Sequence, residues 1–410
     1  MPTHRPFHLM AKPIGPQCNL RCRYCFYLEK EALFAPRRPR RMSDETLEIF
    51  VRRLIESQPG TRVGFAWQGG EPTLLGIDYF RKAVALQRKY ADGKTIENAL
   101  QTNGTLLDDA WGAFLADNGF LVGISIDGPR ALHDRNRFRP HGRGSWAATM
   151  RGLAALRRHN VEFNTLTCVS RANASEPLQV YRFLVEAGSR FLQFIPVVER
   201  MPDEANVDRG LSLAAPSPGL PRATRATDWS VRGAEWGAFL IGIFDRWIRR
   251  DIGAVQVQQF EDALGRWLGL PGGVCVHSET CGRALAIEHD GSVYACDHYV
   301  YPEYRLGNIR DDTLAAMVDG ERQIAFGLAK RDGLPERCRR CPVRFACQGG
   351  CPKHRFGTSP NGEAGLNHLC DGYWAFFAHV DPYMRLMADL YRSGTNPAEI
   401  RSLLATTRRS

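Results

Sequence analysis

The sequence has no apolar run of about 18 residues, the length needed to span a bilayer, although 44% of its 410 residues are hydrophobic. Its first residues, MPTHRPFHLM, lack the apolar stretch of a secretory signal peptide. It also contains no internal repeat of solenoid length. These absences predict a globular, cytoplasmic protein of about two or three domains with no membrane partner.

The chain carries a surplus of positive charge, with a net charge of +10. Basic runs lie near the start and at the end of the chain, at Arg37, Arg38, Arg40, Arg41 and at Arg408, Arg409. Such runs are typical of a solvated basic surface and also occur in nucleic-acid-binding proteins. Because no aromatic residues are interleaved with basic repeats, the pattern favours the solvated surface and argues against a nucleic-acid partner.

The first half of the chain alternates strand-like and helix-like segments, which is typical of an α/β fold with a parallel sheet. Strands are expected at 63–68, 97–103, 121–127, 162–170 and 191–198, with another before residue 18. Among the helices, one is expected to have Ser43 as its N-cap, and another is expected to begin at Ser175 and stop at Gly188. About six strand–helix units are too few for a closed eight-fold barrel, so we expect a partial (β/α)6 TIM-like barrel.

The rest of the chain divides by composition. We expect the barrel in residues 1–233, where 199–233 is rich in Pro, Ala and Ser and resembles a flexible excursion or linker. A helical connector is expected at 234–274, a cysteine-rich domain at 275–372 and a helical C-terminal segment at 373–410.

Twelve cysteines in a reducing compartment indicate metal ligation rather than disulfides. The first three lie in CNLRCRYC, spaced C-x3-C-x2-C: Cys18, Cys22 and Cys25. Three thiolates can form three corners of a zinc site, or can hold a cubane iron–sulfur cluster with one iron left open. No fourth ligand lies nearby in the sequence, which favours the open cluster over a zinc knuckle.

Polar motifs follow three successive predicted strands. They are WQGGEP with Gln68, Gly69, Gly70 and Glu71, QTNG with Asn103, and SIDG with Ser125 and Asp127. Because the carboxyl ends of parallel strands meet on one face, these motifs are expected to line an active site. As isolated motifs, each is also compatible with a tight turn or a helix cap.

Eight further cysteines lie in the second half of the chain. They are Cys275, Cys281, Cys296, Cys338, Cys341, Cys347, Cys351 and Cys370. Eight ligands suffice for two four-cysteine sites, either iron–sulfur clusters or zinc ribbons. Cys168 is left over and lies in an apolar run, so we expect it to act as a small buried side chain.

Together these motifs resemble the radical S-adenosylmethionine superfamily, including its aromatic residue, Tyr24, before the third cysteine. The resemblance implies that Tyr24, Gly69, Gly70, Glu71, Asn103, Ser125 and Asp127 bind the cofactor. The later cysteines resemble the twin-cluster SPASM extension. That resemblance implies one cluster on Cys275, Cys281, Cys296 and Cys351, and another on Cys338, Cys341, Cys347 and Cys370.

Over almost its whole length the chain resembles the anaerobic sulfatase-maturating enzymes, through KPIGPQCNLRCRYCFYL, WQGGEPTL, QTNGTLL, SIDGP and the later cysteines. In that family the acid following the third SPASM cysteine, here Asp297, is the catalytic base. The resemblance also implies that Tyr27 and Gln68 face the peptide substrate.

The implied activity is oxidation of a Cys or Ser side chain of a sulfatase to Cα-formylglycine. It would use S-adenosyl-L-methionine and three [4Fe-4S] clusters. The implied partners are an unfolded or nascent sulfatase polypeptide and a low-potential electron donor such as a ferredoxin or flavodoxin. Two alternatives remain. One is a SPASM maturase that forms thioether or carbon–carbon crosslinks in a peptide, although only 17 residues precede Cys18, too few for a precursor-binding domain. The other is a zinc-binding nucleic-acid module.

Overall fold

A single large sheet organises the molecule, which is represented by a computed structural model describing residues 3–34, 41–216 and 224–406. The sheet has ten strands in the order β10-β9-β8-β1-β2-β3-β4-β5-β6-β7. Much of the basic surface expected from the sequence, namely Arg37, Arg38, Arg40, Arg408 and Arg409, lies outside the described residues.

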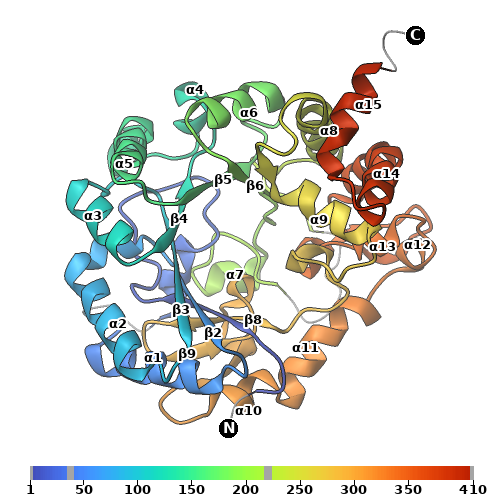
Figure 1. Cartoon of the computed structure of the whole chain (residues 1–410). Helices are drawn as coiled ribbons and strands as arrows, with labels where there is room; N and C mark the ends of the chain where they lie inside the picture. The colour runs from blue at the N-terminus through green and yellow to red at the C-terminus, as the bar shows by residue number, and fades with distance from the viewer. Residues whose placement is uncertain (1–2, 35–40, 217–223, 407–410) are drawn as a thin grey trace.

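The strands from β1 to β7 are parallel and follow one another in chain order, which confirms the predicted partial barrel (Figure 1). The six expected strands are present, and a two-residue strand, β7, continues the sheet from within the expected helical connector. Their bounds are β1 His8–Lys12, β2 Arg62–Trp67, β3 Thr95–Thr102, β4 Phe120–Ser125, β5 Phe163–Val169, β6 Phe191–Pro196 and β7 Gln256–Val257.

Helices cover the outside of this curved sheet (Figure 1). They are α1 Asp44–Ser57, α2 Ile77–Tyr90, α3 Asp109–Asp117, α4 Arg130–His133, α5 Trp146–Arg158 and α6 Pro177–Glu186. The core between the two layers is aromatic: Phe50 of α1 packs on Phe65 and Trp67 of β2, with ring centroids 5.6 and 5.7 Å apart. Burial of such side chains supplies most of the stabilisation that holds each helix on the sheet.

One of the two expected helix caps is present. Ser43 accepts a hydrogen bond from the backbone N–H of Thr46 at 3.1 Å, as predicted for an N-cap. The cap predicted at Ser175 is wrong: α6 begins at Pro177, and the preceding Glu176 is the N-cap residue without a side-chain bond. Proline at the first helical position has the right φ and needs no N–H partner, so it can start the helix without a polar cap.

The segment 199–233 contains a short helix, α7 Glu204–Asp208, and residues 217–223 within it lie outside the described part of the chain. Several of its described side chains are buried, among them Leu211, Leu213 and Val231. Two longer helices follow, α8 Gly233–Arg250 and α9 Gln258–Trp267.

The cysteine-rich segment is joined to the barrel through the sheet itself. β8 Ala284–Glu288 pairs in parallel with β1 along its whole length, from His8↔Ala284 to Lys12↔Glu288. β9 Ser292–Tyr294 and β10 Arg305–Asn308 then continue the sheet in antiparallel pairing. The remaining elements are α10 Leu314–Val318, α11 Glu321–Asp332, α12 Glu336–Arg339, α13 Arg344–Cys347, β11 Gly357–Thr358 and β12 Ala364–Leu366.

The last helices, α14 Cys370–Arg392 and α15 Ile400–Thr406, lie beside α8 (Figure 1). α14 and α8 approach so closely that a Cβ on Gly372 would lie 1.9 Å from the carbonyl oxygen of Gly233. Glycines on both helices therefore allow direct backbone contact. Among the described residues, no helix is both long and apolar enough to cross a membrane.

We predict that Gly372→Ala destabilises the protein, because the added methyl group would overlap the backbone of α8. Overpacking of this kind typically costs about 1–3 kcal/mol. The matched control is Gly265→Ala in α9, where a Cβ meets nothing within 4 Å and alanine favours the helix. Thermal unfolding should show a lower Tm for Gly372→Ala and an unchanged or higher Tm for Gly265→Ala. An unchanged Tm for Gly372→Ala would contradict the close packing.

Candidate active site

The first cysteine loop, residues 18–25, is preceded by backbone that packs directly against the GGEP loop after β2. The backbone N–H of Gly70 donates to the carbonyl of Gly15, and that of Glu71 donates to the carbonyl of Gln17, both at 2.8 Å. A Cβ on Gly70 would lie 1.8 Å from the Gln17 carbonyl oxygen. Gly69 has a φ of +132°, which side chains rarely adopt. These glycines therefore bring the two predicted motifs together.

Glu71 links the ends of two strands from inside the protein. Its Oε1 accepts hydrogen bonds from the hydroxyls of Thr73 and Thr102 at 2.6 and 2.7 Å, and its Oε2 accepts from the backbone N–H of Asn103 at 2.7 Å. Burial raises the pKa of this carboxyl, and the bonds it accepts oppose that rise. The side chain is thus committed to protein partners, and it positions the two loops.

Asn103 connects the QTNG motif to the first cysteine loop. Its Nδ2 donates to Asn19 Oδ1 at 2.8 Å and lies 3.8 Å from the Cys18 thiol. Its Oδ1 accepts from the backbone N–H and the hydroxyl of Thr105 at 2.9 and 2.7 Å. The amide therefore fixes the position of Cys18 relative to the end of β3.

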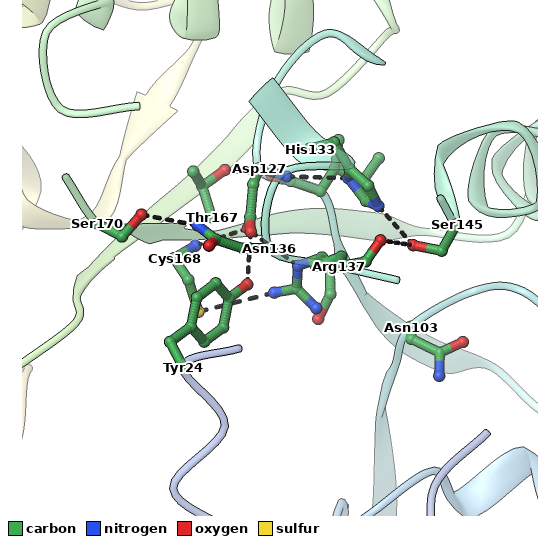
Figure 2. A network of polar contacts seen from close by, with 12 residues as sticks. Tyr24, Asn103, Asp127, His133, Asn136, Arg137, Ser145, Thr167, Cys168 and Ser170 are labelled. Atoms are coloured by element: carbon green, nitrogen blue, oxygen red, sulfur yellow. Dashed lines mark hydrogen bonds and ion pairs between the residues drawn. The ribbon is translucent and has the colours of Figure 1, made fainter. Parts of the chain in front are cut away.

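Ser125 is the last residue of β4, and Asp127 lies two residues beyond it. Asp127 makes more hydrogen bonds to the protein than Ser125 does. Ser125 Oγ accepts from Gln101 Nε2 at 3.1 Å. Asp127 is almost fully buried, and both of its carboxylate oxygens have protein partners, one of them the hydroxyl of Tyr24 at 2.5 Å (Figure 2). Asp127 and Tyr24, two predicted cofactor residues, are thus bonded to each other.

The first three thiols lie close enough to influence one another, and the guanidinium of Arg137 acts to lower the pKa of Cys22 and Cys25. Burial raises the pKa of Cys18 to about 12, and the pKa of Cys22 rises for the same reason, with the neighbouring thiols adding to it. Thiols bind iron as thiolates, so a bound cation must offset this cost. The group fits a cluster with three protein ligands.

The eight later cysteines lie in an inner thiol group of Cys275, Cys281, Cys296 and Cys351 and an outer thiol group of Cys338, Cys341, Cys347 and Cys370. Burial raises the pKa of Cys281 and of Cys296, and the neighbouring thiols of Cys351 and Cys275 add to the rise. These four thiols therefore lie close together. The four members of the outer thiol group line one cavity: Cys338, Cys341, Cys347 and Cys370. Among the described residues no three His, Cys, Asp or Glu side chains converge on a single-ion site.

Asp297 lies directly after Cys296 of the inner thiol group and forms an ion pair with Lys12 at the end of β1. Lys12 is 1% exposed and Asp297 18% exposed. Burial acts to raise the pKa of the Asp297 carboxyl, but Lys12, His298 and Lys353 together outweigh it, so the pKa lies below its usual value. The pair therefore presents an ionised carboxylate where the barrel and the cysteine-rich segment meet.

Of the two residues predicted to face a peptide, Tyr27 contacts this pair and Gln68 is bonded to Ala11, next to Lys12. The Tyr27 hydroxyl donates to Glu288 on β8, and the Lys12 ammonium lies 3.9 Å from the centre of the Tyr27 ring. Tyr27 is 3% exposed, while Gln68 is half-buried and its backbone N–H donates to the carbonyl of Ala11 at 2.8 Å. Tyr27 therefore acts as a buried support for Lys12 in this structure.

Sequence reasoning missed several residues of the site. Lys12 begins the KPIGPQ stretch, which by itself indicates no role for the lysine, and its link to Asp297 depends on the pairing of β1 with β8. Lys353 forms an ion pair with Glu199, and its ammonium lies 4.8 Å from the centre of the Phe26 ring. Arg137, which pairs with Asp127 at 3.0 Å, could have been suspected only from its place shortly after SIDG.

We predict that Gly70→Ala impairs the site, since its methyl group would displace the backbone that leads into the first cysteine loop. After anaerobic reconstitution, the variant should bind less iron than the wild type and unfold at a lower temperature. Gly64→Ala in β2 is the control, because a Cβ there meets nothing within 4 Å. Equal iron content in both variants and the wild type would show that the close approach is unimportant.

Comparison with known proteins agrees with this geometry. Residues 13–184 match the Radical SAM superfamily, and residues 275–342 match SPASM, an iron–sulfur cluster-binding domain. The chain is 43% identical over 403 residues to the serine-type anaerobic sulfatase-maturating enzyme of Bacteroides thetaiotaomicron, covering 98% of this chain and 96% of that protein. It is 33% identical over 380 residues to the cysteine-type enzyme of Clostridium perfringens, covering 92% and 97%.

A solved structure, native anSMEcpe with bound AdoMet and Kp18Cys peptide, is similar over almost the whole chain. The TM-score is 0.80 at 32% sequence identity, over 94% of this chain and 99% of that one. Fold, domain matches and full-length identity all agree, and the chain belongs to the anaerobic sulfatase-maturating enzymes, a family of radical SAM enzymes with a SPASM domain.

Proposed function

We propose that the protein oxidises the Cβ of a Ser or Cys side chain in a sulfatase polypeptide, giving Cα-formylglycine. The observation that carries the proposal is the buried Lys12–Asp297 ion pair, which holds a carboxylate beside the first cysteine loop and the inner thiol group. Relatives named serine-type and cysteine-type sulfatase-maturating enzymes support it. Because the relative with 43% identity is serine-type, a serine peptide should be a substrate.

The cofactors we assign are S-adenosyl-L-methionine and three [4Fe-4S] clusters. Cys18, Cys22 and Cys25 would hold the first cluster, and the inner and outer thiol groups would each hold one more. When bound, S-adenosylmethionine at the first cluster would supply the radical chemistry that removes a hydrogen atom, and clusters in the inner and outer thiol groups would serve as electron acceptors. The number of cysteines supports this assignment, since eleven of the twelve would be ligands.

The residues of the chain would bind and orient the reactants. The hydroxyl of Ser125 and the backbone of the GGEP loop are the groups best placed to contact the cofactor, because Glu71 and Asp127 are already bonded to protein donors. Asp297 would accept the proton that the substrate side chain loses during oxidation. Lys12 would keep that carboxylate ionised and correctly oriented before the reaction.

The proposed partners are an unfolded or nascent sulfatase and a low-potential electron donor such as a ferredoxin or flavodoxin. We place the reaction in the cytoplasm, where thiols stay reduced. Anaerobic incubation of the reconstituted protein with cofactor, reductant and a serine peptide of a sulfatase tests the proposal. Mass spectrometry should detect formylglycine. A crosslinked peptide instead would indicate the other class of SPASM maturase.

We predict about twelve irons per chain after anaerobic reconstitution, four for each of three clusters. Replacing Cys18, Cys22 and Cys25 with Ala should leave about eight and should abolish formation of 5′-deoxyadenosine, since the open iron is lost. Iron and sulfide analysis checks the first statement, and chromatography of the cofactor products checks the second. Four or fewer irons in the wild type would contradict two SPASM clusters, and zinc without sulfide would support a zinc module.

We predict that Asp297→Asn separates cofactor cleavage from peptide oxidation. Asparagine has a similar shape but cannot accept the proton, so formylglycine production should fall by about 10²–10⁴-fold, the usual contribution of a positioned acid–base group. Formation of 5′-deoxyadenosine should continue, because it depends on the first cysteine loop. Both products are measured in the same anaerobic reaction.

Asp297→Asn leaves the Lys12 ammonium without its ion-pair partner, so a control must separate this effect from the loss of the base. The double variant Lys12→Met/Asp297→Asn removes both charges, so stability lost by leaving a buried ammonium alone should return. Peptide oxidation should remain low in the double variant, as the base is still absent. Recovery of formylglycine together with Tm would mean that Asp297 only neutralises Lys12.

A further inference from the structure

A short loop, here called the bridging loop, joins the two thiol groups. It begins at Cys347 of the outer thiol group and ends at Cys351 of the inner thiol group. The three residues between them have φ angles of +49°, +70° and +64°, a region that favours glycine, and they are Gln348, Gly349 and Gly350. The backbone therefore turns in a left-handed conformation exactly where it passes from one thiol group to the other.

Arg355 is a buried side chain that holds the bridging loop. Its Nε donates to the carbonyl of Gly349 at 3.0 Å, and its Nη2 donates to the carbonyls of Gln348 and Gly350 at 2.9 and 3.3 Å. Its Nη1 donates to the carbonyl of Lys330 in α11 at 2.5 Å. The rigid, planar fork of one guanidinium therefore binds every residue that lies between the two thiols of the loop.

The positive charge of Arg355 is compensated by no carboxylate among the described residues. Arg355 is 7% exposed, and the hydrogen bonds that it makes within the described part of the chain all go to backbone carbonyls. Buried charges are normally paired with an opposite charge or with a metal site. Burial lowers the pKa of the guanidinium, and thiolates of both groups oppose that fall, namely Cys338 and Cys347 of the outer group and Cys351 and Cys281 of the inner group.

Lys330 extends this arrangement to another member of the inner thiol group. Its ammonium donates to the carbonyls of Cys275 and Val276 at 2.6 and 3.0 Å, and the residue is 1% exposed. Because the carbonyl of Lys330 accepts from Arg355, two buried cations connect the backbone at Cys275 with the bridging loop. Positive charge is thus built into the protein beside thiols that carry negative charge when they bind a metal.

We propose that Arg355 is a positioning residue shared by the inner and outer clusters: it fixes the bridging loop and supplies a positive charge that acts on both. A nearby cation favours the more negative, reduced form of a cluster, so Arg355 makes each of them easier to reduce. A shared charge shifts both potentials in the same direction. The inference rests on the proposed assignment of two clusters to these thiols and not on the identity of the peptide product.

The test compares Arg355→Gln and Arg355→Lys with the wild type by redox titration followed by electron paramagnetic resonance, after anaerobic reconstitution. Arg355→Gln removes the charge, so both clusters should become about 10-fold harder to reduce, a fall of about 59 mV for one electron. Arg355→Lys loses the planar fork but keeps the charge, so its Tm should fall while both potentials stay close to those of the wild type. Asn367 donates to the carbonyls of Gly349 and Cys351 at 3.1 and 3.4 Å, so the loop keeps support in both variants.

Arg340→Gln is the matched control, because it removes the same charge next to Cys341 of the outer thiol group, from a side chain that is 83% exposed. Solvent and salt screen that charge, so both potentials should equal those of the wild type. Full iron in Arg355→Gln with unchanged potentials would overturn the proposal, and a shift confined to one cluster would overturn the shared role. A wild type without the two clusters would overturn the cluster assignment as well.

Iron content decides the matter if Arg355→Gln fails to bind both clusters. A need for positive charge predicts that Arg355→Lys binds more iron than Arg355→Met, which has similar bulk but no charge. Equal or greater iron binding by Arg355→Met would overturn the proposal, because packing alone would then hold the loop. Loss of iron from both variants would also overturn it, since the fork and not the charge would then be required.

Discussion

Strand β1 is the element on which the rest of the structure depends, because it is hydrogen-bonded along both edges. One edge belongs to the barrel through β2, and the other belongs to the cysteine-rich segment through β8. Its last residue, Lys12, is in register with Glu288 and forms the ion pair with Asp297. The five-residue strand β1 thus places Asp297, the proposed base in the cysteine-rich segment, against the cofactor motifs of the barrel.

The acidic residues of the cofactor motifs serve mainly as internal connectors. Glu71 joins the ends of β2 and β3, and Asp127 joins the first cysteine loop to the ends of β4 and β5. A buried carboxylate must be matched by donors or cations, and both residues have such partners. The site is therefore preorganised by charged groups that are bonded to protein donors.

Sequence analysis anticipated the parts of the molecule that depend on local spacing. The cysteine intervals, the strand-end motifs and the partial barrel were all recognisable, because each reflects a short pattern with a direct geometric meaning. Lys12 and Arg137 were not, since their importance arises from partners that are distant in the sequence. The start of α6 was also misjudged, because proline at position 177 made a polar cap unnecessary.

The direct backbone contact between α8 and α14 has a consequence for the outer thiol group. α14 begins at Cys370, a member of that group, and Gly372 lies against α8 only two residues later. The two glycines that let the helices touch therefore also fix the position of an outer thiol, so a bulkier pair would displace Cys370 together with the helix that carries it.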